Sequence, residues 1–426
     1  MKSLRFSLFL VIVSSKEITV RILRLLTENT GLSSLSAEQK ACVLGACSIY
    51  LPFPLTICVI VAMLYRYRNV VSLRVLFEET PGIRWILLFW AISVLSSVLW
   101  QNWLGFANAL GIILIFVFIM MYRHFLDRKM LECTIFWWVL LSIPAGLFGI
   151  IQYLYYSIQA GTIMVQDNPD MRVSSVFFHT NLYATLLVMV ILLCMYCFIC
   201  YKSREDRMFL LCTASFNFFM LLLTGCRSAL VPFALVVPVF FWADNKQKLL
   251  RITLLAEAIA AISILFIPDL IPRLDDVSTL YSRMRIWQAT LDYLPQCFWF
   301  GMGPQAFALL GDATQLYAPH AHNILLDSLL CYGITGTICI VGFVLTQLIR
   351  LFRMHKSHGD RALFSLVLCL YIAAVIQGVI DVTLDFPATG LMFLLLICSP
   401  PPWPSQAAPD EKEQGSHRLP VFPIDL

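Results

Sequence analysis

The chain has 426 residues, of which 59% are hydrophobic and 13% are charged, and its mean hydropathy is +0.80. Soluble domains carry about 25% charged residues, so this composition excludes a soluble enzyme and indicates a polytopic membrane protein. The net charge of +4 excludes no class of protein, because the positions of the charged residues along the chain are more informative than their sum. Backbone groups in lipid are satisfied only in helices or closed barrels, and nearly uncharged runs of about 20 residues match helices. The predicted fold class is all-α.

Apolar runs follow one another along the chain, and we expect each to cross the membrane once. They lie at residues 41–65, 83–100, 103–121, 134–155, 182–201, 208–224, 227–242, 248–268, 323–351, 363–381 and 387–399. Residues 5–14 form a further short apolar stretch, for which a span is favoured over an interfacial helix or a signal-like segment. The sequence thus predicts an integral membrane domain over residues 1–400 with about 11 to 12 transmembrane helices.

The charges of the short loops predict the orientation of these spans. Lys and Arg concentrate in alternate loops, which the positive-inside rule places in the cytoplasm: residues 65–69, 122–129, 202–206, 245–248 and 350–356. The less basic connections are expected outside. The longest of them, residues 269–322, is expected to bear short helices. The Pro-rich tail, residues 401–426, is predicted to be cytoplasmic and disordered.

A histidine pair directly precedes a long apolar run. If a helix begins near Asn323, Gly333 returns to within about 20° of the face of His322, and Gly336 falls about 40° to the other side. The two glycines would then form a smooth strip below His322, open to a neighbouring helix or a thin lipid chain. In the alternative, His322 only caps the helix and the glycines only pack it. His320 is expected in the loop or the cap.

Arginines gather on the predicted outer face, where the positive-inside rule expects few. Arg227 joins two apolar runs, and either a bound anion or snorkelling to the interface would offset its desolvation; the first is favoured. Arg283 and Arg285 would point about 200° apart on a helix, so only one can face a shared site. Arg283 is favoured because Trp287, four residues on, shares its face. In the alternative, both are solvated loop arginines.

Other polar residues receive simpler interpretations. No P-loop, dinucleotide fingerprint, HExxH or nucleophile elbow is present. Asp275 and Asp276 could pass for the acid pair of a sugar transferase, but an ordinary turn is favoured. Asp381, in the last external turn, is expected only to pair with outer arginines. Cysteines are expected to behave as small hydrophobes. The remaining histidines on the cytoplasmic side are expected to be solvated: His124, His355, His358 and His417.

Four segments together resemble the O-antigen ligase and O-antigen polymerase family of multispanning membrane glycosyltransferases. They are "FFHTNLYA" (177–184), "LLTGCRSAL" (222–230), "SRMRIWQATLDYLPQCFWFGMGPQAF" (282–307) and "HAHNILLDSLLCYGITG" (320–336). His322 and Asn323, nine residues, Gly333, two residues and Gly336 fit the ligase pattern of that family. The chain departs from the family at Cys226, where serine is frequent, and at His179, in a segment that is commonly rich in glycine or proline.

The resemblance implies transfer of a glycan from a polyprenyl-diphosphate carrier to a glycan, lipid or envelope acceptor. It implies a catalytic region over about residues 172–340 of a multi-pass protein in the bacterial cytoplasmic membrane, with its site facing outward. Arg227 and Arg283 would hold the diphosphate, because guanidinium forks match phosphate, and His322 would be the general base of an inverting displacement. No metal, cofactor or nucleic acid is expected. The expected substrate-binding residues are Arg285, His320, Asn323, His179, Asn181, Arg172, Trp287, Gly333 and Gly336.

Three alternatives differ in function. A polysaccharide polymerase would use the same chemistry on a carrier-linked acceptor. An anion transporter would use the outer arginines as an entry site, but it should show broken helices in corresponding halves. A non-catalytic membrane scaffold would not need a histidine aligned with two glycines.

Overall fold

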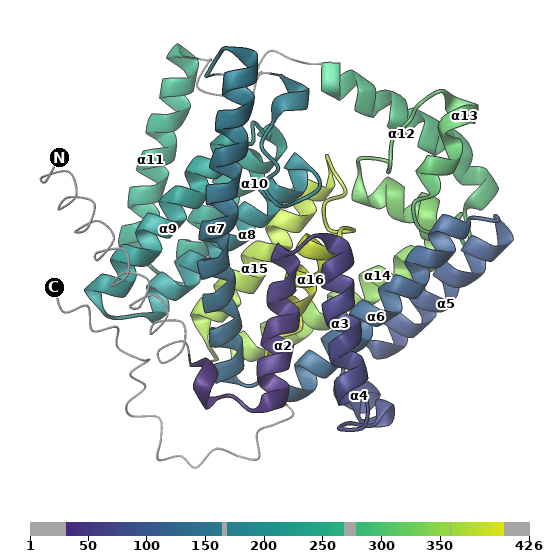
Figure 1. The fold of residues 1–426 in the computed structure, drawn as a ribbon, viewed down its shortest axis with the longest axis horizontal. Coiled ribbons are helices and arrows are strands. Elements are labelled where there is room, and N and C mark those ends of the chain that lie inside the picture. Colours follow the sequence, from purple (N-terminus) through teal and green to yellow (C-terminus); the bar gives the residue numbers. More distant parts are fainter. Residues whose placement is uncertain (1–30, 164–167, 268–277, 358, 404–426) are drawn as a thin grey trace, which may run out of the picture.

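A computed structural model of the chain describes residues 31–163, 168–267, 278–357 and 359–403 (Figure 1). All regular secondary structure in these residues is helical, which confirms the predicted all-α class. The helices are α2 (Ala37–Cys47), α3 (Phe53–Tyr67), α4 (Leu73–Glu79), α5 (Ile83–Leu99), α6 (Trp103–Phe125), α7 (Arg128–Ala160), α8 (Thr180–Cys200), α9 (Arg204–Leu223), α10 (Arg227–Ala243), α11 (Gln247–Phe266), α12 (Ser278–Cys297), α13 (Gly311–Thr314), α14 (Ile324–Lys356), α15 (Arg361–Gly378) and α16 (Pro387–Ile397). The predicted span at 5–14, Asp275, Asp276 and the tail from 404 onward lie outside the described residues.

Fewer described helices than predicted are long enough to cross a membrane. Among the described residues, seven helices are long and apolar enough to cross a membrane: α6, α7, α8, α9, α11, α14 and α15. The pair α4 and α5, bent by 115°, passes the same test together, and α3, α10 and α16 are shorter apolar helices. The polytopic architecture is confirmed, with seven or eight helices of full spanning length in the described part, compared with the 11 to 12 spans expected for the whole chain.

The apolar run at 41–65 does not form one span. It is divided between α2 and α3 by a break at Pro52, whose ring fixes φ and whose nitrogen has no hydrogen to donate. The two helices lie side by side (Figure 1). The start of α2 and the end of α3 lie close together, since the Tyr67 hydroxyl donates to the Ala37 carbonyl oxygen at 3.3 Å. The run therefore turns back on itself, because proline favours a turn over a continuous helix.

The remaining connections gather at two opposite ends of the helical layer. At one end, the basic loop after α6 meets the loop before α15 through an ion pair between Arg128 and Asp360. There, Arg123 is buried and donates to the carbonyl oxygens of Cys398 and Pro402 at 2.6 and 3.0 Å. The less basic connections meet at the other end. This separation agrees with the alternation of basic loops.

Two histidines that were expected to be solvated have partners. His124 has only 23% of its side chain exposed and contacts the carboxylate of Glu79. His355 stacks on Phe364, with ring centroids 4.0 Å apart. Both predictions were wrong, because tertiary neighbours cover the ends of these helices. His358 and His417 lie outside the described residues.

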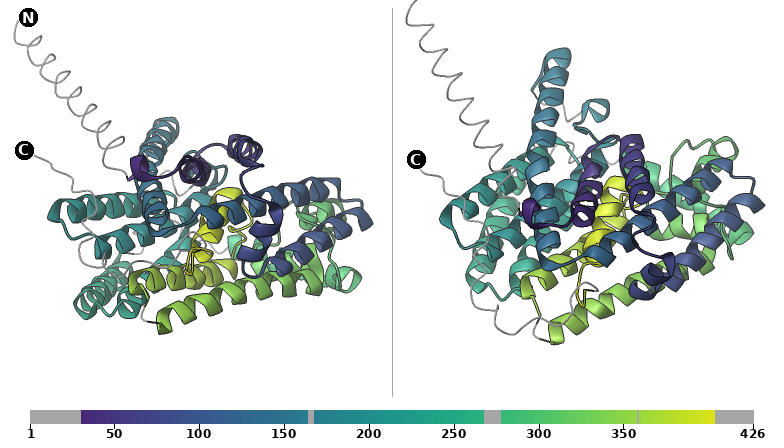
Figure 2. Two further views of the ribbon diagram at one scale, coloured as in Figure 1. Left: turned by 90° about the horizontal axis from the view of Figure 1, so that it is seen from below. Right: turned by 60° about the horizontal axis from the view of Figure 1, so that its bottom comes forward.

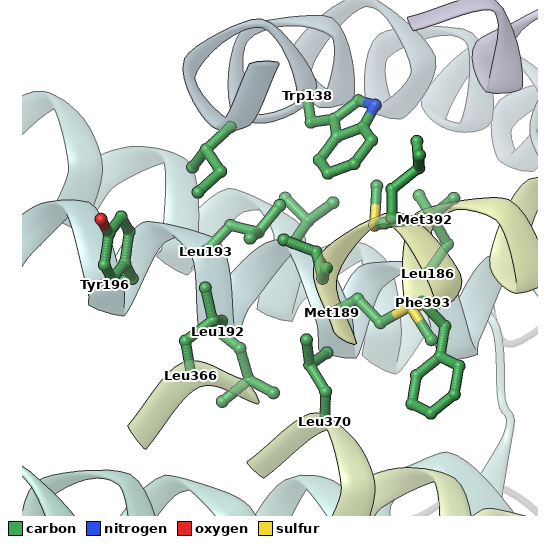
Figure 3. Packing of buried hydrophobic residues seen from close by; sticks show 14 of the residues in the cluster. Trp138, Leu186, Met189, Leu192, Leu193, Tyr196, Leu366, Leu370, Met392 and Phe393 are labelled. Carbon is green, nitrogen blue, oxygen red and sulfur yellow. The ribbon is translucent and has the colours of Figure 1, made fainter. Parts of the chain in front are cut away.

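The core is centred on α8, which is apolar around its whole circumference, as a helix buried on all sides requires. Figure 3 shows its side chains packed against α7, α15 and α16 through Trp138, Leu370 and Phe393. A second cluster joins α5, α12 and α14 through Phe89, Ile286 and Leu330. Two further views show α14 and α15 together along one face (Figure 2). The two clusters hold the N-terminus of α8 and the start of α14 in fixed positions.

The helix α14 is broken at Gly333. This residue has φ 63° and ψ −174°, a conformation that glycine adopts readily. The segment after α12 crosses the break: the backbone N–H of Met302 donates to the carbonyl oxygen of Leu330, and that of Ile334 donates to the carbonyl oxygen of Phe298, at 2.9 and 2.8 Å. A Cβ on Gly333 would lie 2.4 Å from the backbone of Trp299. Only glycine permits this close approach.

The break overturns the predicted smooth strip below His322. The projection from His322 to Gly333 assumed an unbroken helix, and the backbone of Trp299 occupies the space that was expected to be open. A Cβ on Gly336 would lie 2.5 Å from the Cβ of Tyr332 and 3.4 Å from Ile92 of α5. Both glycines therefore permit close packing of backbone and helices, and the predicted open strip does not exist.

Candidate active site

The carboxylate of Asp381 lies at the centre of a cluster of polar side chains that includes His322, Asn181 and Arg283. Asp381 follows α15, and its backbone N–H donates to the Gln377 carbonyl oxygen at 2.9 Å. Its side chain is 3% exposed. Oδ1 lies 3.0 Å from Nδ1 of His322, and Oδ2 accepts from Nδ2 of Asn181 at 2.5 Å and lies 3.9 Å from the guanidinium of Arg283. The loop that carries Asp381 lies in the middle of the molecule (Figure 1).

Asp381 stays ionised in this setting. Burial alone would raise the pKa of its carboxyl, but the hydrogen bond from His322 and the charges of His322, His320 and Arg283 hold that pKa well below its usual range. The expectation that Asp381 only pairs with outer arginines missed its contact with His322. The available signal was its position directly after an apolar run, on the same predicted face as the histidine pair.

His322 is held in one orientation and one tautomer. Because Asp381 is an anion, it accepts a hydrogen bond from Nδ1–H, which leaves the lone pair on Nε2. The backbone of His322 is left-handed, with φ 50°, an uncommon conformation for a residue other than glycine. Its N–H donates to Nδ1 of His320 at 3.2 Å, and its carbonyl oxygen accepts from Nε1 of Trp287 at 3.4 Å. These contacts aim the imidazole.

The loop of the histidine pair is tied to both neighbouring helices. The Ala321 N–H donates to the buried carboxylate of Asp327 in α14 at 2.7 Å. Asn323 caps α14, as its Oδ1 accepts from the N–H groups of Leu325 and Leu326, and its Nδ2 donates to the Val379 carbonyl oxygen at 2.9 Å. The predicted helix start at Asn323 is confirmed, and Asn323, not His322, is the cap.

Asn181 joins the N-terminal end of α8 to the same carboxylate. Its Oδ1 accepts from the guanidinium of Arg172 at 3.2 Å, and Arg172 also donates to the Thr224 carbonyl oxygen at 2.9 Å. The Asn181 N–H donates to Nδ1 of His179, the N-cap of α8, at 3.1 Å. These three residues, which the sequence predicted for substrate binding, thus lie around Asp381.

The arginines of α10 and α12 converge on one face. Arg227 begins α10 and donates to the Thr279 hydroxyl at 3.2 Å. Thr279 lies one helical turn before Arg283, and so the two share a face of α12. The side chain of Arg283 is 18% exposed and faces Asp381, whereas Arg285 is exposed and has no partner among the described residues. This is the orientation that the spacing between Arg283 and Trp287 predicted.

Ligand atoms for a metal ion are also present. Atoms of His320, His322 and Asp381 lie within 4.8 Å of one another, and imidazole and carboxylate groups both bind zinc. The guanidinium of Arg283 lies 3.9 Å from the second oxygen of the same carboxylate. Added positive charge there would be opposed by Arg283, so the surrounding charges suit an anionic ligand better than a cation.

Comparison with known proteins supports the same region. The O-antigen ligase family model matches residues 210–341, from α9 to α14. The match includes Arg227, Arg283 and His322 and stops before Asp381. No curated protein was found to match the chain. Residues 210–341 of this polytopic membrane protein therefore match an O-antigen ligase domain, in agreement with the resemblance seen in the sequence.

Proposed function

We propose that the protein transfers a glycan from a polyprenyl-diphosphate carrier to an acceptor hydroxyl, by an inverting displacement that needs no metal. The observation that supports this most directly is the hydrogen bond between His322 and the buried carboxylate of Asp381, which shares one end of the molecule with Arg227 and Arg283. We place this end on the outer face of the bacterial cytoplasmic membrane, because the basic loops lie at the opposite end.

His322 is the general base in this proposal. Its Nε2 takes the proton of the acceptor hydroxyl as the oxygen attacks the anomeric carbon. Asp381 stabilises the imidazolium that forms and keeps Nε2 available in the resting state. The bond between the anomeric carbon and the diphosphate oxygen breaks in the same step, and its electron pair leaves with the diphosphate. A single displacement from the opposite side inverts the anomeric centre.

Arg227 and Arg283 stabilise the leaving group. Negative charge grows on the diphosphate as the bond breaks, and fixed cations aimed at developing charge commonly contribute most to lowering the barrier of such a reaction. Guanidinium groups bind phosphate oxygens in pairs and remain charged at any working pH. The arginines also supply the charge that a metal ion would otherwise provide, which is why we propose a metal-independent reaction.

The test is transfer by purified protein in detergent, with undecaprenyl diphosphate N-acetylglucosamine as donor and alkyl glycosides or carrier-linked glycans as acceptors. We expect His322→Ala to lower the rate about 100- to 10,000-fold, the range for a positioned base. His355→Ala, at the opposite end, is the matched control and should keep wild-type rates. Activity should survive EDTA. A His322→Ala protein with normal turnover would overturn the mechanism, and preference for carrier-linked acceptors would identify a polymerase.

A further inference from the structure

The three histidines of the site present different ring nitrogens to their surroundings. Nδ1 of His179 accepts from the N–H of Asn181 at 3.1 Å, and Nδ1 of His320 accepts from the N–H of His322 at 3.2 Å. A neutral imidazole with an accepting Nδ1 carries its proton on Nε2. His322 is the reverse, since its Nδ1 donates to Asp381. His179 and His320 are therefore Nε2–H donors, because backbone N–H groups occupy their Nδ1 atoms, whereas Nε2 of His322 is an acceptor.

Both donors are uncharged near neutral pH. Burial lowers the pKa of His320 to about 4. The pKa of His179 is also lowered, because neighbouring protein atoms displace part of its water and Arg172 adds positive charge nearby, although the residue as a whole remains exposed. Nε2 of His320 lies 3.9 Å from Oδ1 of Asp381. His179 differs: it is exposed, and its Nε2 has no hydrogen-bond partner in the described part of the chain.

His179 is joined to the base by a short chain of hydrogen bonds. His179 contacts Asn181, Asn181 contacts Oδ2 of Asp381, and Oδ1 of Asp381 contacts His322. The centre of this chain is buried, and its histidine ends are more exposed. His322 is close enough to His179 for its charge to lower the pKa of His179, so an acceptor whose hydroxyl meets Nε2 of His322 lies near the free donor of His179.

We propose that Nε2–H of His179 binds a hydroxyl of the acceptor glycan next to the hydroxyl that reacts, and that His179 thereby selects the acceptor. This rests on the proposed function. A hydroxyl fits better than a diphosphate oxygen, because an uncharged imidazole is a weak partner for an anion, and Arg227 and Arg283 already supply forks suited to phosphate. Those arginines are carried by α10 and α12, whereas His179 begins α8.

The variant His179→Asn separates binding from the structural role of this residue. Asparagine is a favoured N-cap, and its Oδ1 can accept from the Asn181 N–H as the imidazole does, but it lacks the distal donor. With undecaprenyl diphosphate N-acetylglucosamine as donor and octyl glucoside, octyl galactoside and their monodeoxy analogues as acceptors, we expect the acceptor KM to rise about 3- to 10-fold, as for one neutral hydrogen bond. The donor KM should be unchanged.

The deoxy analogues give the sharper result. Wild-type enzyme should lose kcat/KM on removal of one particular hydroxyl, and His179→Asn should be indifferent to that removal. A raised donor KM with an unchanged acceptor KM would show a diphosphate contact and overturn the proposal. Unchanged kinetics, or loss of folded protein in both His179→Asn and the cap-competent His179→Ser, would leave His179 as a cap only.

Failure of the proposed function is distinguishable from failure of this inference. If wild-type protein makes no product from any acceptor, glycan transfer fails. Direct binding of octyl glucoside and octyl galactoside to wild-type and His179→Asn proteins, followed by tryptophan fluorescence, then tests His179 alone. Weaker binding by the variant of the glycoside that the wild type prefers supports the inference, and equal binding contradicts it.

Discussion

Nδ1 of His322 lies 3.0 Å from Oδ1 of Asp381, although 59 residues separate the two in the chain. This contact decides which imidazole nitrogen can accept a proton. In Asp381→Asn the amide can donate to Nδ1 and favour the wrong tautomer. We expect kcat to fall about 100- to 10,000-fold, as when a catalytic histidine loses its orienting carboxylate, with a smaller change in donor KM. Steady-state kinetics would check this, and an Asp381→Asn enzyme with wild-type kcat would contradict it.

The two arginines of α12 should differ in their importance. Arg283→Ala should abolish transfer, because its side chain is turned toward Asp381, whereas Arg285→Ala should be mild, because that side chain is exposed. Arg227→Ala should also abolish transfer. Arg→Lys at 227 or 283 should rescue poorly, since an ammonium cannot replace the fork. Initial rates at equal amounts of folded protein provide the measurement; equal activity of the Arg283 and Arg285 variants would contradict the assignment.

Substitution of Gly333 should impair folding of the protein and not the binding of substrate. Its φ of 63° strains any side chain, and a Cβ would lie 2.4 Å from the backbone of Trp299. We expect Gly333→Ala to reduce the yield of monodisperse protein in detergent. Gly111→Ala in α6 is the matched control, since a Cβ there meets nothing within 4 Å and alanine favours helix. A Gly333→Ala protein that is obtained in normal yield but has lost transfer activity would show that Gly333 has a role in substrate binding.

Acid should destabilise the fold partly through His320. Burial lowers the pKa of this imidazole to about 4, whereas in the unfolded chain it takes up a proton near pH 6.5. The neutral buried form therefore contributes its full stability above about pH 6.5, and that contribution is lost as the pH falls toward 4. We expect a smaller drop in Tm between pH 7.5 and 5.0 for His320→Gln than for wild type.

The orientation in the membrane can be tested by cysteine accessibility. Asp312→Cys should react with a membrane-impermeant maleimide from outside the cell, because it lies in the connection before the histidine pair. Asn245→Cys, in the basic loop between α10 and α11, should react only after permeabilisation. A cysteine-free background is required, since the native Cys58 and Cys212 are exposed. Labelling of position 312 only after permeabilisation would invert the proposed topology.

Much of the architecture follows from local pattern alone. Each apolar run from residue 83 onward is helical in the structure, with a break at Gly333 in α14. An apolar segment in lipid has to form its backbone hydrogen bonds within itself, and a helix does so. The start of α14 directly after Asn323 followed from the point where the apolar run begins. The preference for Arg283 over Arg285 needed only the angular spacing of residues on a helix.

Tertiary structure decided what depends on segments far apart in the sequence. Helical periodicity placed Gly333 below His322, but the chain after α12 enters α14 at that residue and breaks the helix. The predicted topology placed Asp381 and His322 on one face, but no local pattern could show that the two side chains touch, or that Asn181 donates to the second oxygen of the carboxylate. Local sequence fixes elements through backbone sterics and burial, whereas a site is a set of contacts between elements, and those exist only once the helices have packed.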